Sequence, residues 1–263
     1  MNRDRQSGHI LHVDGADLYY EDSGPTTRPA LLMLHGGLGS IEDLRAFEPA
    51  LAERFRMIRI DSRGHGRSTL GTEDVTYQRL EADALRVLRH LDVRQTAVLG
   101  FSDGGIVAYR LMASQQIEIA TLVTIGAPCE LEDDDPVRDI YARVTGPSWR
   151  ERFPDSHESY QRLNPAPDFD RLVSSCVQMW LDSEESGYPG GRVEEIEGDV
   201  LLLRGDGDHL FTRRQAVDLA DRIRGSVFAN IPFAGHAAHE ERPDLCVRIV
   251  EEFLGTRAGA GDA

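Results

Sequence analysis

Short apolar runs alternate with longer segments of mixed polarity along most of the chain. These runs are nearly continuous, as expected for strands that are buried on both faces of a parallel sheet. They cover residues 30–34, 55–60, 96–100, 120–125, 199–203 and 226–231. Two further runs, residues 9–13 and 16–22, alternate apolar and polar positions around Asp14-Gly15, which predicts a β-hairpin.

The segments between the apolar runs place apolar residues three and four positions apart, a spacing that is typical of amphipathic helices. Helices are predicted over residues 43–55, 76–92, 105–115, 213–223 and 244–254. Strands and helices that alternate in this way predict an α/β fold with a doubly wound, mainly parallel sheet.

One long interval, residues 129–198, interrupts this alternation and is rich in acidic residues and proline. A simple crossover between parallel strands needs only ~10–12 residues, and this interval also contains short helical patterns, such as residues 170–183. We therefore predict a core of residues 1–128 and 199–263 with an inserted helical cap of residues 129–198. A cap of this kind covers ligands at the carboxyl ends of the strands.

The composition excludes several classes of function. All 29 basic residues are arginine, so Schiff-base chemistry, lysine-anchored pyridoxal phosphate and a Walker A loop are ruled out. The formal net charge of -16 makes nucleic acid and anionic membranes unfavourable partners.

The beginning of the chain and its cysteines bear on the cell compartment. The first ten residues have no apolar segment of the kind found in signal peptides, and no apolar run approaches the ~18 residues of a membrane span. Cys129, Cys176 and Cys246 are far apart in sequence, which favours reduced thiols over a disulfide framework or a zinc site. We expect a cytoplasmic protein without a metal or cofactor.

Residues 100–104 read GFSDG and match the motif G-x-S-x-G between a predicted strand and a predicted helix. A sharp turn at this point lifts the Ser102 hydroxyl above the sheet and sets it at a helix N-terminus, which favours negative charge on an attacked carbonyl. The pattern therefore indicates a nucleophile elbow. A glycine-rich turn in which Ser102 only caps the helix is the alternative.

A nucleophilic serine needs a base, and the base needs an acid to orient it. The loop after residues 199–203 carries two candidate acids, Asp206 and Asp208, and the loop after residues 226–231 carries His236. The resulting order of serine, aspartate and histidine is the order expected in α/β hydrolases.

With these residues the chain resembles the α/β-hydrolase superfamily over nearly its whole length. Residues 35–39, HGGLG, are similar to the family's HGxG loop, and residues 61–68, DSRGHGRS, are similar to its architectural D-x-R-G-x-G-x-S loop. The resemblance implies an α/β-hydrolase fold, with an oxyanion hole formed by the backbone N–H groups of Gly37 and Asp103.

The same resemblance implies which aspartate belongs to the catalytic triad and which branch of the superfamily the chain is most similar to. Asp208 matches the family's G-x-x-D position, with Asp206 in reserve. Haloalkane dehalogenases and epoxide hydrolases carry aspartate where this chain has Ser102, so both are disfavoured. The segment GFSDGG resembles the GWSDGG elbow of the valacyclovir hydrolase-like branch, which implies that Asp103 receives a substrate α-ammonium group. Alternatively, Asp103 caps its own helix.

The remaining polar side chains are expected to support this site. The histidines at positions 35 and 65 are interpreted as structural, and those at 209 and 239 as lining or supporting the pocket. A metal bound by the cluster of Asp206, Asp208 and the nearby histidines is disfavoured because the spacing fits no ligand motif. The aromatic residues Trp149, Phe153 and Trp180 are expected to hold the cap together or to line an apolar pocket.

The sequence thus predicts a serine hydrolase that cleaves small-molecule carboxylic esters through an acyl-enzyme, without a cofactor. A lactonase or a C–C bond hydrolase of the same fold remains open. The latter would have an arginine-lined cap pocket, for which Arg138, Arg143, Arg150 and Arg152 are available. A ligand receptor or scaffold that keeps the triad without turnover is the alternative of another class.

Overall fold

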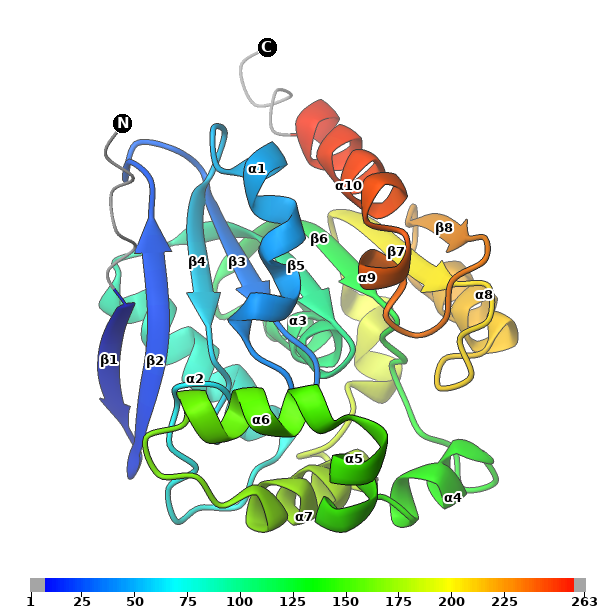
Figure 1. The fold of residues 1–263 in the computed structure, drawn as a ribbon. Coiled ribbons are helices and arrows are strands. Elements are labelled where there is room, and N and C mark those ends of the chain that lie inside the picture. The colour runs from blue at the N-terminus through cyan, green and yellow to red at the C-terminus, as the bar shows by residue number, and fades with distance from the viewer. Residues whose placement is uncertain (1–7, 258–263) are drawn as a thin grey trace.

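The computed structural model describes residues 8–257, which fold around one eight-stranded sheet with the order β1-β2-β4-β3-β5-β6-β7-β8 (Figure 1). The predicted hairpin is present as β1 (Gly8–Val13) and β2 (Ala16–Ser23), and β2 also pairs antiparallel with β4. All other neighbours pair parallel. The predicted α/β fold with a mainly parallel sheet is therefore confirmed. The parallel strands are β3 (Ala30–Leu34), β4 (Arg56–Ile60), β5 (Gln95–Phe101), β6 (Glu118–Ile125), β7 (Asp199–Gly205) and β8 (Val227–Ile231).

Helices cover both faces of the sheet, and successive strand residues point to opposite faces. In β3, Leu32 and Leu34 belong to one buried cluster while Leu31 and Met33 belong to the other. The first cluster is covered by α2 (Tyr77–His90), α3 (Asp103–Ser114) and α8 (Arg213–Arg222). The second is covered by η1 (Ile41–Phe47), α1 (Glu48–Leu51), α9 (Ala238–Glu241) and α10 (Pro243–Arg257).

Two expectations about single elements were wrong. The predicted helix over residues 43–55 is a 3₁₀ helix, η1, followed by the single turn of α1. Pro49 explains the break, because proline has no N–H to continue the helical ladder and is tolerated only in a first turn. Strand β8 is not buried on both faces: it is the edge strand, and Val227 keeps 42% of its surface exposed.

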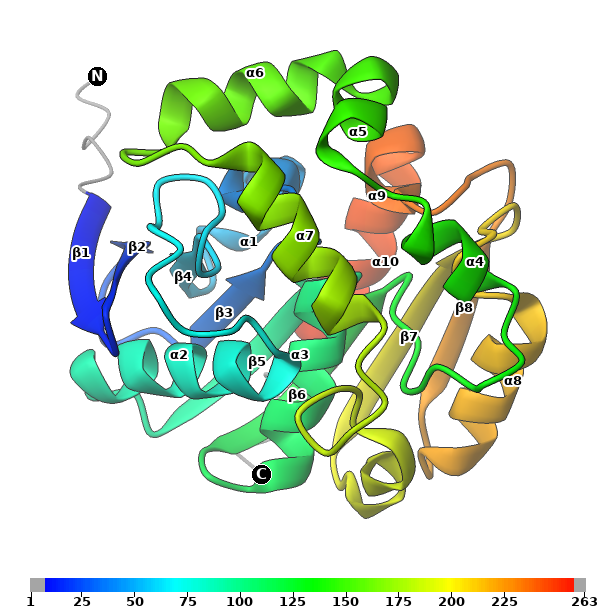
Figure 2. The same ribbon diagram turned by 90° about the horizontal axis from the view of Figure 1, so that it is seen from below.

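The interval between β6 and β7 forms a helical layer over the carboxyl ends of the strands (Figures 1 and 2). This layer consists of α4 (Val137–Ala142), α5 (Gly146–Arg152), α6 (Pro154–Leu163) and α7 (Phe169–Trp180). The last helical turn of the interval, η2 (Gly190–Glu195), packs against α3 of the core instead. Within residues 8–257, no helix combines the length and the apolar character needed to cross a lipid bilayer.

Candidate active site

Ser102 stands at a strained turn between β5 and α3. Its backbone angles are φ 49° and ψ -117°, in a region that residues with a side chain rarely adopt. The two motif positions that flank the serine are glycine, and a Cβ atom at either one would clash with the backbone. One built at Gly104 would lie 2.1 Å from the Leu34 carbonyl oxygen, and one at Gly100 would lie 2.4 Å from the Gly104 carbonyl oxygen. The strand-to-helix elbow predicted for the GFSDG motif is therefore present.

The structure brings the predicted nucleophile, base and acid together. The Ser102 Oγ atom lies 2.9 Å from His236 Nε2, and His236 Nδ1 lies 3.0 and 3.1 Å from the two carboxylate oxygens of Asp208. Each of the three residues follows the carboxyl end of a strand, β5, β8 and β7 respectively. Because parallel strands end at the same edge of a sheet, loops that are distant in sequence meet there.

The Asp208 carboxylate is held in place by its own loop. It is buried, with 4% of its surface exposed, and its Oδ1 atom accepts hydrogen bonds from the N–H groups of Leu210 and Phe211 at 2.9 and 3.1 Å. The reserve candidate Asp206 is on the surface, where it pairs with Arg213 and accepts a hydrogen bond from Asn230. These donors, Asn230 first, lower the pKa of Asp206. The geometry favours Asp208 over Asp206 as the partner of the histidine.

The glycine loop after β3 lies against the elbow. A Cβ atom built at Gly36 would lie 3.3 Å from Ser102 Cβ, and one at Gly37 would lie 2.4 Å from Asp103 Oδ2. The loop is anchored by His35, whose Nδ1 bonds the Gly36 carbonyl at 2.7 Å and whose Nε2 accepts from the N–H of Ser62 at 2.9 Å. Gly37 and Asp103, the predicted oxyanion donors, are therefore neighbours beside the serine.

The Asp103 side chain turns away from its own helix and is hydrogen-bonded by two other elements. Tyr77 of α2 donates to one carboxylate oxygen at 2.9 Å, and the indole N–H of Trp180 in α7 lies 2.9 and 3.0 Å from the two oxygens. Burial raises the pKa of Asp103, although the hydrogen bonds from Trp180 and Tyr77 oppose this shift. Neither donor was predicted, since both lie far from Asp103 in sequence and belong to no motif.

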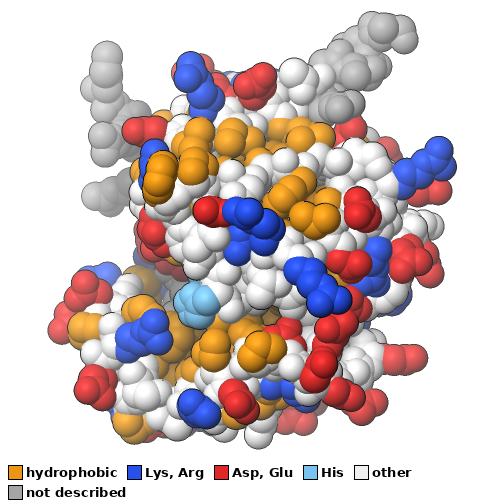
Figure 3. Space-filling view, turned by 90° about the vertical axis from the view of Figure 1, so that its right-hand side faces the viewer, with side chains coloured by type: hydrophobic (Ala, Val, Ile, Leu, Met, Phe, Trp, Pro, Cys, Tyr) orange, Lys and Arg blue, Asp and Glu red, His pale blue; other side chains and the backbone are white. Residues whose placement is uncertain are grey.

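A pocket of about 820 Å³ lies between the core and the cap, over Ser102. Figure 3 shows a hollow on one face of the molecule, where apolar side chains are exposed between the core and the cap. The three aromatic residues Trp149, Phe153 and Trp180 all line the pocket. The rings of Trp149 and Phe153 also contact each other, with centroids 4.6 Å apart. These aromatic side chains thus serve both of the roles expected for them.

Charged residues line the same pocket. From the cap, Arg143 and Arg152 contribute, while Arg150 pairs with Asp170 at 2.7 Å. From the core, Asp43, Glu240 and Glu241 contribute, together with His209. The sequence did not single out these acids. In sequence, Ser40 and Asp43 match a helix-capping pattern, and nothing in that pattern indicates that Asp43 also lines the pocket.

Of the other histidines singled out from the sequence, His35, His65 and His239 are buried, whereas His209 lines the pocket and is exposed. Burial lowers the pKa of His35 to about 3 and that of His65 to about 4, so both are neutral at pH 7. His65 bonds the Arg63 carbonyl at 2.9 Å, which fits the structural role predicted for it. Within residues 8–257, no three His, Cys, Asp or Glu side chains are grouped as a metal site would require.

A mainly parallel eight-stranded sheet with a serine, a histidine and an aspartate joined by hydrogen bonds at the carboxyl ends of its strands defines the class of α/β hydrolases. Residues 31–249 match the model of the Alpha/beta hydrolase family, and the chain belongs to this family.

The similar proteins carry the names of hydrolases and esterases. Serine hydrolase BPHL of Mus musculus is 29% identical over 257 residues, which span 92% of this chain and 84% of that protein. The bifunctional esterase/perhydrolase DCH of Acinetobacter calcoaceticus is 34% identical over 228 residues, spanning 77% and 83%. Among solved structures, a hydrolase from Pseudomonas aeruginosa PA01 superposes with a TM-score of 0.75 at 25% identity and covers 97% of this chain and 100% of that one.

Proposed function

We propose that this protein is a serine hydrolase that cleaves small-molecule carboxylic esters through an acyl-enzyme. The observation that carries the proposal is the continuous hydrogen-bonded line from Ser102 through His236 to Asp208 at the floor of a pocket. Such a line lets the imidazole accept the serine proton as the hydroxyl attacks. The similarity to proteins named serine hydrolase and esterase/perhydrolase supports ester substrates.

The proposed reaction has two halves. In the first, Ser102 Oγ bonds to the ester carbonyl carbon while His236 takes its proton, and the Gly37 and Asp103 N–H groups stabilise the oxyanion. His236 then gives the proton to the leaving alcohol as the C–O bond breaks. In the second half, water attacks the acyl-enzyme with His236 again as base, which releases the acid and restores the serine. Asp208 holds the imidazole in the required tautomer throughout.

The test compares two serines of the same helix region. Ser102→Ala should lose at least ~1000-fold in turnover of a short-chain p-nitrophenyl ester, and it should no longer react with a fluorophosphonate probe. Ser114→Ala, at the far end of α3 where the hydroxyl bonds the Leu111 carbonyl, should keep both properties. Probe labelling without ester turnover would favour a receptor, and unchanged hydrolysis by Ser102→Ala would refute the mechanism.

A finer proposal concerns the acyl group: the enzyme prefers α-amino acid esters. Asp103 follows the nucleophile directly, lines the pocket and forms no ion pair with an arginine within the described chain. A buried carboxylate without a counter-charge is unfavourable, and a substrate ammonium group would supply that charge. Tyr77 and Trp180 each donate to this carboxylate, which leaves acceptor positions free because a carboxylate has about four lone-pair sites.

Amino acyl esters and their N-acetylated counterparts distinguish the two acyl classes. If Asp103 receives the ammonium group, the free amine should be the better substrate in kcat/KM, and Asp103→Asn should remove that preference. Equal rates for both esters would remove the acyl specificity and leave the ester hydrolase proposal intact.

A further inference from the structure

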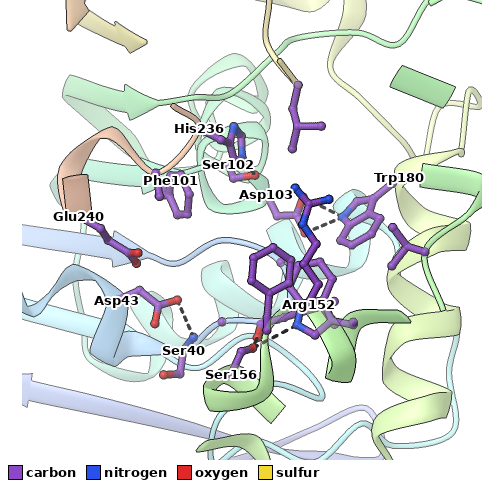
Figure 4. A pocket seen from close by; sticks show the side chains of 18 of the residues that line it. Ser40, Asp43, Phe101, Ser102, Asp103, Arg152, Ser156, Trp180, His236 and Glu240 are labelled. Carbon is purple, nitrogen blue, oxygen red and sulfur yellow. Dashed lines mark hydrogen bonds between the residues drawn. The ribbon is translucent and has the colours of Figure 1, made fainter. Parts of the chain in front are cut away.

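Two side chains from different parts of the molecule meet at the Asp103 carboxylate. Tyr77 belongs to α2 of the core, whereas Trp180 ends α7 of the cap. Figure 4 shows the Trp180 indole directed at Asp103 beside Ser102, with their hydrogen bonds drawn. The residue that follows the nucleophile is therefore held by groups from outside the elbow.

The hydrogen bonds to Asp103 favour its ionised form. Oδ1 accepts from the Tyr77 hydroxyl at 2.9 Å, and the Trp180 indole N–H lies 3.0 Å from Oδ1 and 2.9 Å from Oδ2. An indole N–H donates and cannot accept. Such donors bind a charged carboxylate more strongly than a neutral carboxyl group. Burial raises the pKa of Asp103, and the contacts with Trp180 and Tyr77 oppose that shift.

The other titratable groups around Asp103 leave this role to the two donors. A positive charge on His236 also lowers the pKa of Asp103. The remaining groups are acids that are uncharged when protonated, and burial raises their pKa values far enough to keep them neutral between pH 5 and pH 8. They are Tyr77, Tyr141, Cys176 and Tyr188. The charge state of Asp103 thus depends on its two donors and on His236.

The carboxylate faces the loop that carries the other proposed oxyanion donor. A Cβ atom built at Gly37 would lie 2.4 Å from Asp103 Oδ2 and 2.8 Å from Cζ2 of the Trp180 ring. Among the described residues, Oδ2 accepts a hydrogen bond only from the indole N–H. A carboxylate oxygen has two lone pairs, so Oδ2 can also accept from a substrate group that lies beside the scissile carbonyl.

Tyr188 joins the two donors to each other. Its hydroxyl donates to the Trp180 carbonyl at 3.0 Å, and its ring contacts the Tyr77 ring with centroids 5.0 Å apart. The preceding residue is fixed to α3, because the Arg110 guanidinium donates to the Gly187 carbonyl at 2.7 Å. Since both donors are held in this way, they impose one orientation on the carboxylate.

We propose that Tyr77 and Trp180 are positioning residues of the active site: they keep the Asp103 carboxylate ionised and turned toward Gly37, where it binds a cationic group next to the scissile carbonyl. This inference rests on the proposed preference for α-amino acid esters. It adds that the preference depends on one residue of the core and one residue of the cap.

The pH dependence of the amine preference tests this proposal. We compare kcat/KM for alanine ethyl ester and N-acetylalanine ethyl ester below about pH 7, where the free amine stays protonated. Their ratio should fall as Asp103 is protonated, whereas the titration of His236 affects both esters alike. Tyr77→Phe and Trp180→Phe each remove one donor, so the ratio should fall at a pH that is higher by about one unit.

Tyr109→Phe is the matched control. Tyr109 is a fully buried tyrosine of α3, and its hydroxyl bonds to Thr124 Oγ1 at 2.6 Å instead of to Asp103. This variant also loses a buried hydrogen bond, but the pH at which the ratio falls should stay as in the wild type. If Tyr77→Phe and Trp180→Phe lower kcat/KM for both esters without moving this pH, their role is structural and the proposal is overturned.

Trp180 fluorescence reports on Asp103 without a substrate. Trp149 and Trp180 are the two tryptophans of the chain, so a Trp149→Phe protein emits from Trp180 alone. Its emission should titrate with Asp103, because the indole N–H is bonded to that carboxylate. Asp103→Asn should abolish this titration, and Tyr77→Phe should raise its midpoint by about one pH unit.

The two measurements fail independently. A raised fluorescence midpoint in Tyr77→Phe, with equal rates for the two esters, would refute the preference for α-amino acid esters and support the positioning of Asp103. An emission that does not titrate, or a midpoint that Tyr77→Phe leaves in place, would refute the positioning whatever the ester rates are.

Discussion

Asp206 and Asp208 are two residues apart, and their surroundings give them different predicted roles. Asp208 is buried and bonded to His236, whereas Asp206 is exposed and bonded to Arg213 and Asn230. Asp208→Asn should lower kcat by ~1000-fold or more, because an amide cannot hold the imidazole in the tautomer needed for a base. Asp206→Asn should change kcat by less than about threefold. Steady-state kinetics on one p-nitrophenyl ester compares the two, and similar losses in both variants would contradict the assignment.

Asp43 gives a prediction about stability and pH. Burial, with added repulsion from Glu240, Asp61 and Glu42, raises its pKa from 3.8 to about 7, against the opposing Ser40 hydrogen bond. The folded state therefore binds this proton more tightly than the unfolded state, so stability is lost as the pH rises from about 4 to about 7. Asp43→Asn removes that penalty, and its gain in unfolding free energy should be ~1–2 kcal/mol larger at pH 8 than at pH 5.5.

Thermal denaturation at the two pH values checks this prediction. Asp244 is an exposed acid in the first turn of α10. Asp244→Asn therefore controls for the general effect of removing one negative charge and should shift stability equally at both pH values. If Asp43→Asn raises the free energy of unfolding by the same amount at both pH values, the Asp43 carboxylate is ionised in the folded state at no cost in stability.

Local motifs allowed Ser102, Asp208 and His236 to be predicted, since each residue follows a recognisable strand within a few positions. The contacts of Asp103 could not be predicted in the same way. Trp180 is 77 positions away in the cap, and its approach depends on how α7 packs over the elbow. The acids Asp43 and Glu240 were missed for the same reason, because only the folded pocket brings η1 and α9 together.

Periodicity located most strands and helices, and its errors have physical causes. The apolar spacing of residues 43–55 continues through Pro49, but the missing N–H divides the segment into η1 and α1. The apolar run 226–231 looks like a buried strand, yet β8 has a neighbour on one side only. The pattern and number of apolar residues in a strand do not indicate whether that strand lies in the middle of the sheet or at its edge.

The elbow between β5 and α3 depends on close backbone packing, which Gly104→Ala would disturb. The added Cβ atom would lie 2.1 Å from the Leu34 carbonyl oxygen, and a backbone atom cannot move aside as a flexible side chain can. We expect the free energy of unfolding to fall by at least ~2 kcal/mol. Gly191→Ala is the matched control, because no atom lies within 4 Å of its Cβ position. Urea denaturation of both variants gives the comparison, and equal midpoints would contradict this account.

At the scale of the whole molecule, the sequence predicts the mainly parallel sheet and the existence of a cap, but not how the cap packs on the core. A parallel sheet gathers the ends of its strands at one edge, so the order of motifs along the chain predicts that Ser102, Asp208 and His236 meet there. The cap was expected from the length of its interval, its composition and its short helical patterns, which say nothing about how it is oriented on the core. Its orientation is set by single polar contacts that leave no sequence pattern, such as Arg171 donating to the Gly71 carbonyl and Ser156 to the Leu38 carbonyl.

Asn164, which follows α6, is the most connected of these cap contacts. Its side-chain nitrogen lies 2.8 Å from the Ser68 carbonyl oxygen and 3.2 Å from those of Gly64 and Gly66, and its oxygen accepts from the Ala166 N–H at 3.0 Å. The side chain therefore joins the cap to the architectural loop of residues 61–68. Because the site is buried, Asn164→Ala leaves these backbone groups without a partner.

We expect Asn164→Ala to lower the free energy of unfolding by ~1–3 kcal/mol, and to raise KM more than it lowers kcat, since the cap forms part of the pocket wall while Ser102, His236 and Asp208 belong to the core. Gln161→Ala, an exposed position of α6, should change neither quantity. Thermal denaturation and ester kinetics on both variants measure the two effects. A loss confined to kcat would mean instead that this contact supports the catalytic residues, and that the cap keeps its position by its apolar packing alone.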